Sequence, residues 1–117
     1  MCDFLLYKYP HFYPLECKST YADRFDFGML TEIQHDEMIK AAQVEGIKSY
    51  VVVLFASYKR AFLLNILDIE KLEKQGKKSV NIKKLSKWPI PYIEIKTIPS
   101  RKALLDYDFE QAKTIFT

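Results

Sequence analysis

Phe12-Tyr13-Pro14-Leu15-Glu16-Cys17-Lys18 gives this chain its clearest structural signal. Phe4-Leu5-Leu6-Tyr7 precedes it, and Lys8-Tyr9-Pro10-His11 forms the corner between these two largely apolar segments. The arrangement predicts two short neighbouring strands joined by a turn. Because alternate residues of a strand project from the same face, Glu16 and Lys18 should point the same way.

An aspartate, Asp3, opens the first predicted strand, thirteen residues ahead of Glu16. A hairpin can bring Asp3 beside Glu16 and Lys18, so that two carboxylates and one ammonium group converge. Carboxylate oxygens are ligands for Mg²⁺, which takes only one or two of them from a protein. The residues therefore predict a magnesium site held by Asp3 and Glu16, with the backbone carbonyl of Cys17 as a further ligand.

Such a site suits the hydrolysis of a phosphodiester bond. The reaction needs a nucleophilic water and neutralisation of the charge at the leaving oxygen, and a bound Mg²⁺ can supply both. Lys18 would orient the water or stabilise the charge that develops at phosphorus. A Glu-x-Lys triplet on a strand is also commonly a weak surface ion pair, which is the structural alternative.

Length and composition indicate one globular domain, residues 1–117. The hydrophobic fraction of 49% and the aromatic fraction of 15% argue against a disordered chain. No apolar run reaches the ~20 residues of a membrane span, and no signal peptide is visible, so we expect a cytoplasmic protein. Cys2 and Cys17 lie on adjacent predicted strands, which could permit a disulfide, but a cytoplasmic chain favours free thiols. Cys17 should face away from its charged neighbours and into the core.

Beyond residue 18 the pattern predicts a mixed α/β sheet. Residues 19–29 are expected as a loop. Thr31 should cap a helix, with Gln34 in the position of a capping box and Gly46 at the helix end. Two apolar runs, residues 47–55 and 61–67, predict an antiparallel pair of strands.

The remaining segments are shorter. Asp68 should cap a short helix that Gly76 stops, and a second short helical piece is expected over residues 82–87. Residues 92–98 alternate as a half-exposed strand does, and a last helix is expected over residues 108–116.

Lysines crowd one stretch of the chain, although the net charge is only +3. The cluster comprises Lys71, Lys74, Lys77, Lys78, Lys83, Lys84 and Lys87. It can serve as a phosphate-contact surface, for which Lys71, Lys74, Lys77 and Lys78 are the candidates. A solvated helix face and loop is the alternative.

Asp3 followed by Glu16-Cys17-Lys18-Ser19-Thr20 resembles the D…E-x-K core of the PD-(D/E)xK nuclease superfamily, and more closely the RecU-type Holliday junction resolvases. Phe25-Asp26-Phe27, Gly76-Lys77-Lys78-Ser79-Val80 and Trp88-Pro89-Ile90 resemble further segments of that family, in the same order. The resemblance implies a restriction-endonuclease-like fold, in which a mixed central sheet is flanked by helices.

The resemblance also implies roles for single residues. Asp3 and Glu16 would bind Mg²⁺, for which Mn²⁺ is a possible substitute, and Lys18 would be the catalytic lysine. Thr20 lies where the family has a threonine close to the site and the DNA. Gln34 corresponds to a glutamine that would face the metal, with helix capping as the equally weighted alternative.

The chain also departs from the family pattern. The family's N-terminal arm, first helix and stalk precede the aspartate, whereas only Met1 and Cys2 precede Asp3 here. We therefore expect an N-terminally truncated relative. The family's histidine precedes its glutamine, whereas His35 follows Gln34, so His35 is expected as an ordinary surface residue.

The leading functional expectation is a Mg²⁺-dependent endonuclease that cuts branched DNA, such as a four-way junction, in recombination and repair. Symmetric incision requires two active sites, which favours a homodimer. The alternatives are a catalytically impaired relative that binds DNA or a recombination protein, a nuclease for other DNA such as linear ends, and a structural adaptor.

Overall fold

The computed structural model describes residues 4–95. Asp3, Cys2, the end of the predicted strand 92–98 and the predicted helix 108–116 lie outside these residues. Within them, no helix is long and apolar enough to cross a membrane.

The central element is a five-stranded mixed sheet in the order β1-β2-β4-β5-β7. Its strands are β1 (Phe4–Lys8), β2 (His11–Thr20), β4 (Tyr50–Phe55), β5 (Arg60–Asn65) and β7 (Ile93–Ile95). β1 and β2 form the predicted hairpin, with Phe4 opposite Leu15. β2 runs parallel to β4, and the other neighbours are antiparallel. The sheet confirms the expected α/β fold, which is compatible with a restriction-endonuclease-like architecture.

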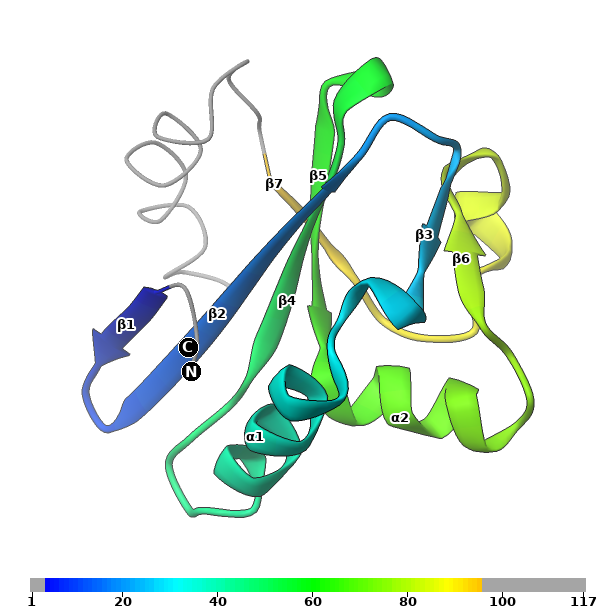
Figure 1. Cartoon of the computed structure of the whole chain (residues 1–117). Helices are drawn as coiled ribbons and strands as arrows, with labels where there is room; N and C mark the ends of the chain where they lie inside the picture. Colours follow the sequence, from blue (N-terminus) through cyan, green and yellow to red (C-terminus); the bar gives the residue numbers. More distant parts are fainter. Residues whose placement is uncertain (1–3, 96–117) are drawn as a thin grey trace.

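Two helices and a small ribbon lie against one face of the sheet (Figure 1). The helices are α1 (Glu32–Ala42) and α2 (Ile66–Lys74), and the ribbon pairs β3 (Arg24–Asp26) with β6 (Ser79–Asn81). Three 3₁₀ segments connect these elements: η1 (Phe27–Met29), η2 (Ala56–Tyr58) and η3 (Ile82–Lys87).

The larger hydrophobic core fills the space between this face and the covering elements. Val51 and Val53 of β4 meet Met38 of α1, Ile69 of α2 and Val80 of β6 there. A second buried cluster lies on the opposite face of the sheet. It contains Tyr13, Leu15, Val52, Ala61, Leu63 and Ile95, with Cys17 packed against it. Cys17 therefore faces away from its charged neighbours, as predicted.

Helix α1 begins as the sequence predicts. Thr31 accepts a hydrogen bond from the backbone N–H of Gln34 at 3.1 Å, and the side-chain oxygen of Gln34 accepts one from the N–H of Thr31 at 3.0 Å. This reciprocal pair is a capping box. The expected helix end was wrong, because α1 finishes at Ala42 and Gly46 lies in the turn that follows.

Other boundaries also differ from the prediction. Residues 19–29, expected as a loop, contain β3 and η1, because the buried Phe25 and Phe27 anchor the segment to the core. Helix α2 is capped by Asn65, whose side chain accepts from the N–H of Leu67 at 2.9 Å. Asp68, the predicted cap, lies inside the first turn.

Candidate active site

Glu16 and Lys18 project from β2 toward the helix-covered face of the sheet. In the parallel ladder Glu16 lies beside Val51 and Lys18 beside Val53, and both valines belong to the larger core. Neighbouring residues of a ladder share a face, so the two polar side chains share the face of these valines. The shared orientation predicted from the spacing is confirmed.

The carboxylate of Glu16 is buried, with 2% of the residue exposed. The ammonium nitrogen of Lys18 lies 4.0 Å from Glu16 Oε2, and 19% of the Lys18 side chain is exposed. Burial of an ionised carboxylate costs free energy unless cations or hydrogen-bond donors compensate for the lost water. Lys18 is one such compensating group, and its separation from Glu16 exceeds a direct hydrogen bond.

The candidate metal ligands are only partly within the described residues. Asp3 lies outside them and directly precedes Phe4, whose partner across the hairpin is Leu15, the residue before Glu16. Among residues 4–95, no group of three or more His, Cys, Asp or Glu side chains could hold a metal ion. The described chain therefore offers the Glu16 carboxylate and the backbone carbonyl of Cys17, and these oxygens fit the preference of Mg²⁺.

Gln34 and Thr20 each accept a local hydrogen bond from a backbone N–H group. Gln34 completes the capping box of α1, which was its alternative role, and its role at the metal remains a prediction. Thr20 ends β2, and its hydroxyl accepts a hydrogen bond from the N–H of Ala22 at 3.1 Å. Its contact with DNA also remains a prediction.

His35 is not an ordinary surface residue. Its side chain is 24% exposed, and Nε2 lies 2.9 Å from Oε1 of Glu73 on α2. The two atoms are close enough for an ion pair when the imidazole is protonated, but their geometry does not make a hydrogen bond. His35 thus connects α1 to α2, which sequence spacing alone could not reveal because Glu73 is far along the chain.

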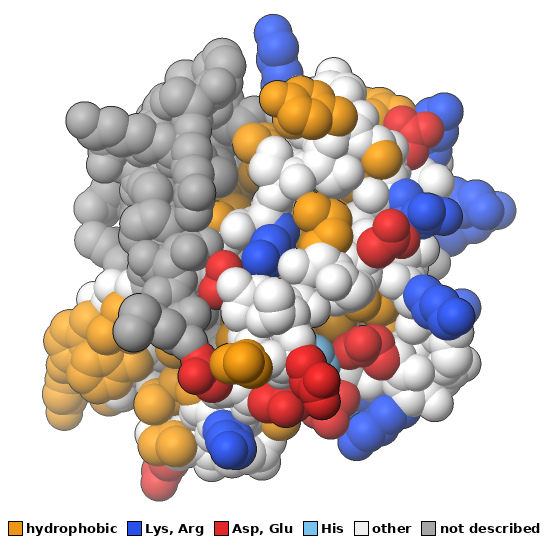
Figure 2. All heavy atoms as spheres, viewed as in Figure 1, with side chains coloured by type: hydrophobic (Ala, Val, Ile, Leu, Met, Phe, Trp, Pro, Cys, Tyr) orange, Lys and Arg blue, Asp and Glu red, His pale blue; other side chains and the backbone are white. Residues whose placement is uncertain are grey.

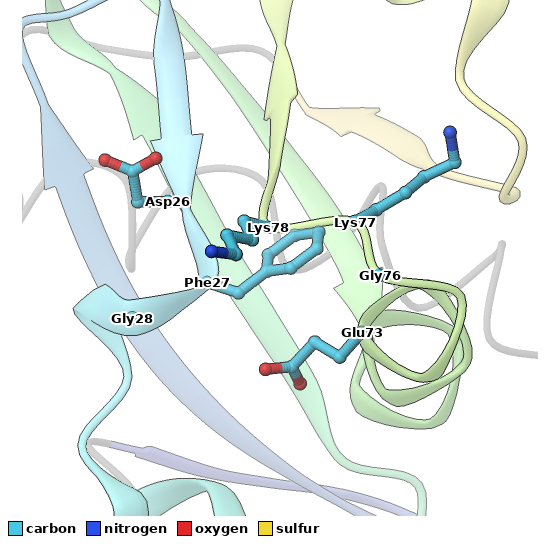
Figure 3. Close-up of a pocket in the computed structure, with 7 residues that line it drawn as sticks. All are labelled: Asp26, Phe27, Gly28, Glu73, Gly76, Lys77 and Lys78. Carbon is cyan, nitrogen blue, oxygen red and sulfur yellow. The ribbon is translucent and has the colours of Figure 1, made fainter.

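The candidate phosphate-contact lysines separate into two groups. Lys71 and Lys74 lie on α2, and Lys74 is 3.4 Å from Glu70. Lys77 and Lys78 lie between α2 and β6, beside a hollow of about 470 Å³ that Asp26 and Glu73 also line. Figure 3 shows the ammonium group of Lys78 near the ring of Phe27, whereas Lys77 extends away from that ring. Because both signs of charge line this hollow, it does not form a simple phosphate site.

The family described as recombination protein U, RecU, matches residues 2–107. The chain belongs to the RecU family. A comparison with curated proteins found no significant match.

RecU membership confirms the resemblance to RecU-type Holliday junction resolvases and connects the chain with nucleases of DNA recombination. The match includes Asp3, Glu16 and Lys18 within its range. It therefore extends across the predicted hairpin that carries the candidate site, and it continues through β7.

Proposed function

We propose that this RecU chain is a metal-dependent endonuclease that hydrolyses phosphodiester bonds of branched DNA, with four-way junctions as substrate. The observation that carries the proposal is the buried carboxylate of Glu16 beside the Lys18 ammonium group on one face of β2. A purely structural surface pair would leave both groups in water, where it contributes little.

In this proposal, Asp3, Glu16 and the Cys17 carbonyl hold Mg²⁺ or Mn²⁺. When bound, the metal lowers the pKa of a water and neutralises charge on the phosphate oxygens. The backbone that carries the Glu16 carboxylate is held in place because Glu16 pairs with Val51 of β4 in the parallel ladder. Burial of Glu16 also keeps competing water away and strengthens its electrostatic interactions.

Lys18 has a different task. Its ammonium group carries three donors and its side chain is partly exposed, so Lys18 can reach a substrate that approaches from solvent. It would orient the attacking water or donate to the phosphate oxygen on which negative charge develops. The chain's location in the cytoplasm and its action as a homodimer, which supplies two such sites, are parts of the same proposal.

The test is cleavage of a labelled four-way junction with Mg²⁺, compared with a linear duplex of matched sequence. We expect symmetric nicks in the junction, and we expect Glu16→Gln to lower the rate at least about 10²-fold. Glu45→Gln, which removes an exposed carboxylate, is the matched control and should cleave normally. No cleavage by the unaltered protein, or equal rates for both variants, would contradict the proposal.

A second candidate function is DNA binding without cleavage. The lysine cluster supports it independently of Glu16, because phosphate contact needs no metal. Salt-sensitive junction binding that is unchanged by Mg²⁺, together with intact substrate at high protein concentration, would favour this candidate.

The proposed homodimer has its own test. Light scattering of the purified protein measures whether the homodimer forms.

A further inference from the structure

A groove of about 470 Å³ lies beside the β3–β6 ribbon and η3, separate from the pair formed by Glu16 and Lys18. Every charged residue that lines it is basic, and none of the described residues along it is acidic. The basic residues are Arg24, Lys77, Lys78, Lys84 and Lys87. Figure 2 shows Lys and Arg side chains along the side of the molecule where Figure 1 places β6.

Two of the basic residues in this region have acidic partners. Lys83 lies 3.0 Å from Asp23, and hydrogen bonds from Tyr58 and Lys83 hold the pKa of Asp23 below its usual value. Arg24 lies 2.9 Å from Asp26. The charge of Lys83 is therefore balanced by Asp23, and neither residue lines the groove. The charge of Arg24 is partly balanced by Asp26.

Four groove lysines have no carboxylate oxygen within 4.0 Å of their ammonium groups among residues 4–95, namely Lys77, Lys78, Lys84 and Lys87. Lys78 points toward the ring of Phe27 (Figure 3), which leaves the other three as the principal positive charges of the groove. Lys77 also extends away from the mixed-charge hollow around Phe27 (Figure 3). Three like charges around one groove attract an anion whose charges repeat along its length.

Hydrogen bonds and aromatic packing hold the η3 segment that borders the groove. Trp88 Nε1 donates a hydrogen bond to the carbonyl of Asn81 at 2.8 Å, and the Trp88 ring packs edge-on against Phe62, with centroids 5.4 Å apart. Asn81 Oδ1 in turn accepts from the N–H of Lys83 at 2.9 Å. These contacts join η3 to the ribbon and the core, so Lys84 and Lys87 extend from an anchored segment.

We propose that this groove binds the phosphate backbone of a DNA arm. The inference rests on the proposed function for its choice of substrate, and it assigns Lys84 and Lys87, with Lys77, to the contact. Lysine is a compact charge that suits phosphate without reading bases. Phe25 and Val80 of the ribbon pack in the same core as Val51 and Val53, so the groove and Glu16 lie on the same side of the sheet.

The lysines that line the groove differ in part from those predicted to contact phosphate from the sequence. Lys71 and Lys74, chosen from the sequence cluster, do not line it, whereas Lys84 and Lys87 do. Linear proximity could not separate these pairs, because the turn at Gly76 and the strand β6 redirect the chain between them. The two pairs therefore provide variants of equal charge for a comparison.

The test is junction binding by fluorescence anisotropy between 50 and 200 mM salt, in EDTA so that cleavage cannot occur. The groove variant is Lys84→Ala/Lys87→Ala, and the control is Lys71→Ala/Lys74→Ala. The slope of log K against log salt is negative, and each lost phosphate contact reduces its magnitude by about 0.9, so the groove variant should reduce it by about 1.8. We expect affinity at 100 mM salt to fall about tenfold or more, against less than about threefold for the control.

Equal losses of junction affinity in the two double variants would contradict DNA binding by the groove. An unchanged salt slope for Lys84→Ala/Lys87→Ala would contradict it as well. Competition by polyglutamate as strong as that by DNA of equal charge would point to an acidic peptide and would likewise overturn it. Cleavage of the same junction by the unaltered protein in Mg²⁺ separates this proposal from the nuclease. Failure of the nuclease proposal leaves the groove slopes intact and shows no cleavage, whereas failure of the groove proposal removes the difference between the two double variants and leaves cleavage intact.

Discussion

Glu16 combines deep burial with a nearby cation, and that combination has a cost when one partner is removed. Lys18→Met takes away a compensating charge 4.0 Å from the carboxylate. Without metal, we expect the free energy of unfolding to fall by about 1–3 kcal/mol, because Glu16 stays buried with less compensation.

Urea denaturation in EDTA measures this effect, and a double-mutant cycle isolates the pair. Glu16→Gln/Lys18→Met should recover most of the loss, because the buried negative charge is gone. Equal destabilisation in the single and double variants would show that Lys18 stabilises the fold by packing alone, without electrostatic coupling to Glu16.

Gly76 is a residue whose backbone angle constrains its identity. Its φ is +86°, and an added Cβ would meet nothing within 4 Å. Gly76→Ala should therefore lower the free energy of unfolding by about 1 kcal/mol through backbone strain without a clash. Gly28→Ala is the control, since the site is equally open and its φ is not in the left-handed region. Thermal melting that ranks the variants in the opposite order would contradict this.

At the scale of single elements, the capping box of α1 gives a measurable contribution. Thr31→Ala removes the acceptor for the Gln34 N–H and should lower the free energy of unfolding by about 1 kcal/mol. Gln34→Glu keeps a side-chain acceptor for the Thr31 N–H, so it should retain nearly full stability. Chemical denaturation distinguishes these outcomes, and a loss in Gln34→Glu as large as that in Thr31→Ala would contradict the capping role.

Local sequence patterns predicted the elements whose causes are themselves local. The hairpin of β1 and β2, the apolar strand β4 and the capping box at Thr31 all follow from alternation or from residues three positions apart. The start of α2 was placed at Asp68 because aspartate is a good cap, but Asn65 at the end of β5 makes the cap.

Tertiary contacts explain the missed features. β3 exists because Phe25 is buried and pairs with Val80, which is distant in sequence. The contact of His35 with Glu73 and the groove around Lys84 depend on how α1, α2 and η3 pack together. For the candidate site, the shared face of Glu16 and Lys18 followed from strand periodicity, whereas the burial of Glu16 required the helices that cover the sheet.

At the scale of the whole molecule, the Arg60–Glu94 pair joins β7 to β5 at the sheet edge. Arg60 donates to both carboxylate oxygens, at 2.8 and 2.6 Å, and these hydrogen bonds hold the pKa of Glu94 below its usual 4.5. Because the folded-state pKa is depressed, the pair stabilises the fold above the unfolded-state pKa and loses this effect as pH falls through the folded-state pKa.

We therefore expect Glu94→Gln to lower the free energy of unfolding by about 0.5 kcal/mol at pH 7, a small value because the pair is partly exposed and screened by solvent. The difference from the unaltered protein should vanish as the pH is lowered past the folded-state pKa of Glu94. Urea titrations at several pH values measure it, and a constant difference down to pH 2 would contradict the assignment.

The most direct measurement of the proposed centre is an NMR titration with Mn²⁺, whose unpaired electrons broaden resonances of nearby nuclei. We predict selective loss of the amide signals of Glu16, Cys17 and Lys18 at substoichiometric Mn²⁺, reversal by excess Mg²⁺, and no selective loss in Glu16→Gln. Broadening that leaves these three signals sharp, or that is the same in Glu16→Gln, would contradict a metal site on β2.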